Sequence, residues 1–104
     1  MGMTLAIEYP ESAPAWNKIR AELSQVSLTV ALRMIDNLPA FPDEEPEDGW
    51  REIRIGVGVG MITLRRNGLR DECIIWGNSD PALIDAWRAV ASACASAGNG
   101  TVAT

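Results

Sequence analysis

The sequence predicts a two-layer α+β domain in which two helices pack on one face of an antiparallel sheet of three to five strands. Three features favour this fold: a strand pattern closed by Asn67-Gly68, an amphipathic helical repeat before it, and a second helical repeat after it. The expected order is strand, helix, two or three strands, helix, and then either a short terminal strand or a flexible tail from about residue 98. A ferredoxin-like arrangement is one topology consistent with that order. With 104 residues, of which 47% are hydrophobic, the chain is expected to form a single domain spanning residues 1–104.

A first strand is predicted at the N-terminus. Residues 4–9 alternate apolar with other side chains, which is the period of a strand, and Pro10 ends the run. Ser12 or Ala13 can then cap a helix that has Pro14 in its first turn, where the missing N–H of proline does no harm.

The next segment predicts one long helix that ends near Asn37. Apolar residues recur there at steps of three or four, namely Trp16, Ile19, Leu23, Val26, Val30 and Met34. From Leu28 onward a second apolar set widens the buried face. An alternative interpretation of residues 26–32 is a strand, because Ser27 and Thr29 are interleaved with apolar residues, but the longer 3.6-residue register favours the helix.

Residues 39–49 (PAFPDEEPEDG) are predicted to form an acidic, proline-rich loop. The segment contains three prolines and a glycine, and it has no hydrophobic period. Its carboxylates do not follow the spacing of an EF-hand loop, so the sequence predicts no metal site there.

The run after Trp50 is too long for one flat strand. Its apolar residues change from odd to even positions between Gly56 and Gly60, which indicates a bend. A β-bulge in one kinked strand would explain the change, but two strands over 51–56 and 60–66 are slightly favoured.

Asn67-Gly68 is predicted to be the two-residue loop of a hairpin, because both residues tolerate the positive φ of a type I′ turn. Such a turn would place Arg66 opposite Leu69. Both faces of the hairpin are then apolar near Trp76 and charged near the turn.

The last helix is predicted to begin at Asp80-Pro81, with the aspartate as N-cap and the proline in the first helical position. It should run to about Ala97, where Gly98 can end it. The segment from Gly100 is expected to be either a frayed tail or a short edge strand.

The composition excludes several kinds of chemistry. The chain has no histidine, so it cannot form a Ser-His-Asp triad, a Cys-His pair or a histidine zinc site on its own. Cys73 and Cys94 have neither CxxC nor disulfide-framework spacing and are expected in the core. The glycines of residues 56–60 are followed by a strand and not by a helix, so close packing is favoured over a nucleotide loop and no cofactor is predicted. We therefore expect no enzyme, with carboxylate-based activity as a remaining alternative.

The charge and the cysteines bear on partners and location. A formal charge of −5 and a pI near 4.6 argue against a general nucleic-acid binder, because phosphate contacts need a basic surface. No apolar run approaches the ~18 residues of a membrane span. The N-terminal sequence lacks the basic and apolar regions of a secretory signal, and the isolated cysteines fit a reducing compartment, so a cytoplasmic location is expected.

Two sets of residues are candidates for function. The first is a possible apolar interface on the side of the hairpin that two helices would leave uncovered, made of Trp50, Val59, Met61, Ile74 and Trp76. The second is a basic set made of Arg51, Arg54, Arg65, Arg66 and Arg70. Trp50 and Trp76 are expected to be partly exposed. The leading interpretation is a small non-enzymatic domain that acts by protein contact as a homodimer; the alternative is a ligand or single-stranded nucleic-acid module that uses the arginines and these tryptophans.

Overall fold

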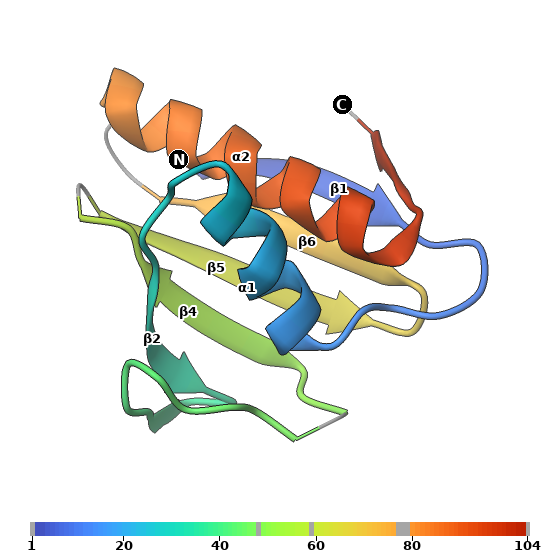
Figure 1. Ribbon diagram of the computed structural model, residues 1–104, viewed down its shortest axis with the longest axis horizontal. Coiled ribbons are helices and arrows are strands. Elements are labelled where there is room, and N and C mark those ends of the chain that lie inside the picture. The colour runs from blue at the N-terminus through green and yellow to red at the C-terminus, as the bar shows by residue number, and fades with distance from the viewer. Residues whose placement is uncertain (1, 48, 59, 77–79, 104) are drawn as a thin grey trace.

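The computed structural model describes residues 2–47, 49–58, 60–76 and 80–103. Its elements in chain order are β1 (Met3–Glu8), α1 (Trp16–Gln25), β2 (Ala31–Ile35), β3 (Leu38–Pro39), β4 (Glu52–Gly56), β5 (Met61–Asn67), β6 (Arg70–Ile75), α2 (Pro81–Gly98) and β7 (Thr101–Ala103). In this part of the chain the strands form one seven-stranded sheet with the order β3-β2-β4-β5-β6-β1-β7. Each of the described strand pairings is antiparallel. Both helices lie on the same face of this sheet (Figure 1).

The predicted fold class is wrong in strand number and strand order. Three to five strands in a ferredoxin-like arrangement were expected, whereas the described residues form seven strands in a different order. In a split βαβ unit a single strand separates the first strand from the strand that follows the first helix, whereas here β4, β5 and β6 all lie between β1 and β2. Of the two expectations for the C-terminal segment, the structure has the edge strand.

The main error is the predicted long helix, because its second half forms β2 and β3. Helix α1 ends at Gln25, and Ser27 then takes a left-handed conformation with φ of 60°. Strand β2 contains a bulge between Leu32 and Met34, so Leu32 and Ile35 face the same side although they are three residues apart. A spacing of three is typical of a helix, and the bulge therefore disguised the strand.

The β5–β6 hairpin is present, but its turn is one residue later than predicted. Asn67 pairs with Arg70, which leaves Gly68-Leu69 as the two-residue loop. Gly68 has φ of +62° and no other turn residue has positive φ, which is typical of a type II′ turn. Arg66 consequently lies opposite Asp71 and not opposite Leu69.

Other predictions made from local pattern are confirmed. The first strand agrees within one residue at each end. The run after Trp50 divides into β4 and β5, and Gly58 between them has φ of +86°. The Asp80 side chain accepts a hydrogen bond of 2.8 Å from the N–H of Ala82 at the start of α2.

The core lies between the helices and the sheet. It contains Trp16, Ile19 and Leu23 from α1, Leu83, Trp87, Val90 and Cys94 from α2, and Ile7, Leu32, Ile53, Ile55, Ile62, Leu64 and Cys73 from the sheet. The indole N–H of Trp87 donates to the carbonyl of Cys73 at 2.8 Å, which fixes α2 on β6. Among the described residues, neither helix combines the length and apolar character needed to cross a membrane.

Candidate functional site: the helix-free face and the arginine pocket

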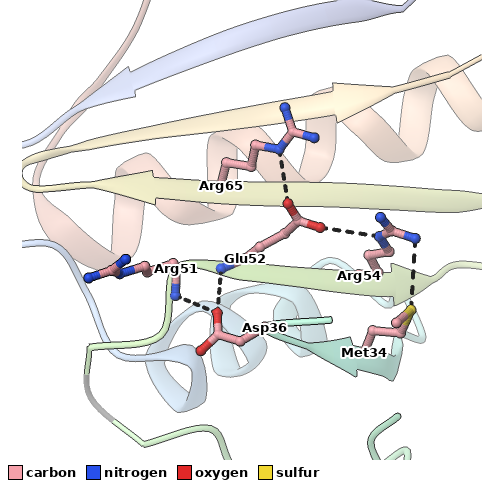
Figure 2. Close-up of polar contacts among 6 residues, drawn as sticks. All are labelled: Met34, Asp36, Arg51, Glu52, Arg54 and Arg65. Atoms are coloured by element: carbon pink, nitrogen blue, oxygen red, sulfur yellow. Dashed lines mark hydrogen bonds and ion pairs between the residues drawn. The ribbon is translucent and has the colours of Figure 1, made fainter. Parts of the chain in front are cut away.

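The sheet face opposite the helices carries a chain of charged side chains. We call it the helix-free face; it includes Met34, Glu52, Arg54, Met61, Thr63, Arg65, Glu72 and Ile74. Figure 2 shows Glu52 at the centre of this chain, with Arg65 Nε donating to its Oε2 at 3.0 Å and Arg54 Nε donating to its Oε1 at 3.3 Å. Arg54 Nη1 also lies 3.8 Å from Met34 Sδ. These contacts connect β5, β4 and β2 across the face.

Trp76 and Met61 are the large exposed apolar side chains at the other end of the same face. Trp76 is 57% exposed and Met61 is 44% exposed. Thr63 pairs with Ile74, so the register brings Met61 and Trp76 together two residues further along the strands. We call these two residues the Trp76 patch.

Arg65 connects the Trp76 patch with the charged residues. Its guanidinium carbon lies 5.7 Å from the centroid of the Trp76 ring, within the range of a cation–π contact. Arg65 and Trp76 therefore enclose the Thr63–Ile74 pair, and both of these side chains are buried although they are on the helix-free face.

A polar pocket of about 630 Å³ lies at the turn end of β5 and β6. We call it the arginine pocket, and it is lined by Asp36, Asn37, Arg51, Glu52, Arg65, Arg66, Asn67, Arg70 and Glu72. Asp36 belongs to the β2–β3 turn, and its Oδ1 accepts the backbone N–H groups of Arg51 and Glu52 at 2.8 and 2.9 Å (Figure 2). The fold thus brings together four of the five arginines predicted as a basic set, whereas Arg54 lies outside the pocket.

Arg66 is the arginine of this pocket whose guanidinium binds a buried carboxylate. Its Nε and Nη2 each donate to the fully buried Asp71 carboxylate at 2.8 Å, and Tyr9 Oη donates to the same carboxylate at 2.6 Å. The Arg66 guanidinium carbon is 4.1 Å from the centroid of the Trp50 ring. Burial and, to a smaller extent, the neighbouring Cys94 and Asp71 raise the pKa of Tyr9, so its phenol stays protonated and donates to Asp71.

The predicted interface residues have different positions in the structure. Met61 and Trp76 are both exposed, as the sequence indicated for Trp76. Trp50 is only 4% exposed, so the expectation of an exposed ring is wrong; Arg66 covers it and it packs into the core. Ile74 is on the expected face but is buried. Val59 lies outside the described residues.

Sequence reasoning missed Asp71 and Asp36. Asp71 alternates with Cys73 and Ile75, and this pattern indicates an inward-facing position, but an aspartate near a turn is usually exposed. Asp36-Asn37 is a turn dipeptide in which both residues have positive φ, as a type I′ turn requires. The assumed helix hid this signal.

The two cysteines and the carboxylates form no cluster placed to hold a metal ion in the described part of the chain. Cys73 and Cys94 are free and buried, and burial raises the pKa of both thiols, to about 12 for Cys94. No group of three or more Cys, Asp or Glu residues among those described is placed to hold a metal ion.

Comparison of the chain with protein-family models, with curated proteins and with solved structures finds no match in any of the three.

Proposed function

We propose that this protein is a non-enzymatic interaction domain that self-associates through the helix-free face of its sheet. The observation that carries the proposal is the Trp76 patch, in which two large apolar side chains are 57% and 44% exposed on the face that no described helix covers. Tryptophan, methionine and arginine are enriched at protein interfaces, and Arg65 lies against the Trp76 ring. Covering the patch with a second copy would remove its apolar surface from water.

Two other strongly exposed apolar side chains lie at an edge of the sheet that is protected from strand pairing. Leu38 and Phe41 are also exposed, but they lie on and just after the two-residue edge strand β3. Pro39 and Pro42 cannot donate backbone hydrogen bonds, so they discourage another strand from pairing with this edge. The central helix-free face is therefore the better candidate for the contact.

A cytoplasmic location is part of the proposal. The two cysteines are free thiols, as is usual for proteins of a reducing compartment.

Light scattering coupled to gel filtration tests the proposal at micromolar concentrations. The wild-type chain should have the mass of a dimer, and Trp76→Ser and Met61→Ser should each shift the mass towards that of a monomer. Val26→Ser is the control, because it removes an exposed apolar side chain at the end of α1, outside the helix-free face, and should leave the dimer intact. A wild-type monomer, or a Trp76→Ser variant as dimeric as the wild type, would contradict the proposal.

The arginine pocket supports a second candidate, a ligand or single-stranded nucleic-acid module. Arg51, Arg65 and Arg70 line one pocket, and Arg65 also contacts Trp76, which could stack on a base. Titration of tryptophan fluorescence with a single-stranded oligonucleotide at two salt concentrations distinguishes this candidate, since binding driven by phosphates must weaken as salt rises.

A further inference from the structure

We propose that the arginine pocket binds the acidic loop of a second copy of this chain. The acidic loop is residues 43–47 (DEEPE), between β3 and β4. This inference rests on the proposed self-association and specifies what holds the two copies in register.

The arginine pocket has more free donors than free acceptors. Within the described residues, neither Arg51 nor Arg70 has a carboxylate oxygen within 4.0 Å. Arg65 uses only its Nε for Glu52, and Arg66 uses Nε and Nη2 for Asp71, so further guanidinium N–H groups of both remain available.

Some of the carboxylate oxygens that line the pocket already accept hydrogen bonds from the same chain. Both Glu52 oxygens accept from arginines, and Asp36 Oδ1 accepts two backbone N–H groups. Glu72 is the lining carboxylate for which the described contacts include no hydrogen bond. The unused donors of the pocket therefore favour a ligand that supplies several carboxylates.

The acidic loop supplies such a ligand. Asp43, Glu45 and Glu47 are exposed, and none of the ion pairs within the described residues involves them. Glu44 accepts the N–H of Phe41 at 3.2 Å, which holds the loop backbone in a turn. Like charges at this density repel one another, and arginines of a partner would relieve the repulsion through charge-assisted, bidentate hydrogen bonds.

The positions of loop and pocket suit a two-fold contact. Glu44, Glu45 and Glu47 line a hollow of about 400 Å³ that shares Asp36 with the arginine pocket, so the acidic and basic surfaces are neighbours. Neighbouring surfaces of opposite charge are self-complementary about a two-fold axis, because each loop then faces the pocket of the other copy. Arg65 also connects the pocket with the Trp76 patch, so one continuous surface can form both contacts.

Nucleic acid fits the pocket less well. Trp50, the ring nearest to Arg66, is buried and cannot stack on a base.

Charge exchange between two variants tests the inference. The pocket-reversed variant is Arg51→Glu with Arg70→Glu, and the loop-reversed variant is Glu45→Arg with Glu47→Arg. Sedimentation equilibrium should show at least about tenfold weaker self-association for each variant alone, which is roughly 1.4 kcal/mol. An equimolar mixture should recover the wild-type affinity, because in the mixed dimer both loop–pocket contacts again join opposite charges. Arg20→Glu with Arg88→Glu is the control for the pocket-reversed variant, since it lowers the net charge by the same amount at exposed helix positions outside the pocket.

The salt dependence and the variants separate this inference from the proposed function. Wild-type association should weaken as sodium chloride rises, because salt screens the loop–pocket contact, whereas a purely apolar contact between copies of charge −5 should strengthen. If both reversed variants associate like the wild type while Trp76→Ser dissociates, the proposed function stands and this inference is wrong. Loss of association without recovery in the mixture, or oligonucleotide binding that depends on Arg51 and Arg70, also overturns it. A wild-type monomer contradicts both.

Discussion

Asp71 organises the charged end of the molecule at the scale of single residues. It is fully buried and accepts hydrogen bonds from Arg66 and Tyr9, which come from β5 and from the end of β1. The same contacts hold Arg66 over the Trp50 ring. The Asp71 carboxylate therefore keeps Trp50 covered and places Arg66 in the lining of the arginine pocket. A buried ion pair of this kind adds little by itself, but removing one partner leaves an uncompensated charge.

We expect Asp71→Asn to lower the free energy of unfolding by about 3–5 kcal/mol, because Arg66 would lose its counter-charge in a site with little solvent. Glu72→Gln is the control, since Glu72 is the next residue of β6 on the helix-free face, and its change should stay within about 0.5 kcal/mol. Urea unfolding followed by tryptophan fluorescence measures both. A loss below about 1 kcal/mol for Asp71→Asn, the level of an exposed ion pair, would show that the buried network has little effect.

At the scale of elements, local signals were sufficient for the first strand and for the start of the last helix. The alternation in β1 and the Asp80-Pro81 start of α2 are visible in the sequence, and both predictions are confirmed. The bulge in β2 places Leu32 and Ile35 on the same face at a spacing of three residues. Because this spacing is typical of a helix, the sequence pattern predicts a helix where the structure has a strand. The Asp36-Asn37 dipeptide forms a type I′ turn and is the local signal for the pairing of β2 with β3.

The turn of the β5–β6 hairpin was misplaced because Asn-Gly is the strongest short hairpin signal. The observed register instead places Arg66 opposite Asp71. Tyr9, from a distant segment of the chain, donates a hydrogen bond to the same Asp71 carboxylate and so helps to stabilise this pairing. Pairing preferences of this kind cannot be read from the turn residues alone.

The expected Asn67-Gly68 turn and the observed Gly68-Leu69 turn predict different effects of substitutions at residues 67 and 68. In the type II′ turn Gly68 needs positive φ, whereas Asn67 belongs to β5, so Gly68→Ala should cost about 1 kcal/mol or more and Asn67→Thr should be neutral or slightly stabilising. Thermal unfolding of the two variants measures the difference. Equal destabilisation by both substitutions would favour the Asn67-Gly68 turn and contradict the observed register.

At the scale of the whole molecule, the sequence predicted the antiparallel hairpin and the amphipathic helices but could not order the strands. Strand β1 pairs with β6, and β7 pairs with β1, so one side of the sheet is built from segments far apart in the sequence, whose pairing has no local signal. The same limit applies to the candidate site. The arginines and Trp76 were identified by residue type, but their division into a pocket and an apolar patch depends on the register and on Asp71.

Self-association through the helix-free face is the central claim, and the chain contains a natural reporter for it. Trp76 is 57% exposed, whereas Trp16, Trp50 and Trp87 are 3%, 4% and 6% exposed. Acrylamide therefore quenches Trp76 preferentially. We expect its quenching of tryptophan fluorescence to fall as the protein concentration rises through the range in which the mass doubles, because the partner covers Trp76. A mass that doubles while the quenching stays constant would place the contact elsewhere and contradict the claim.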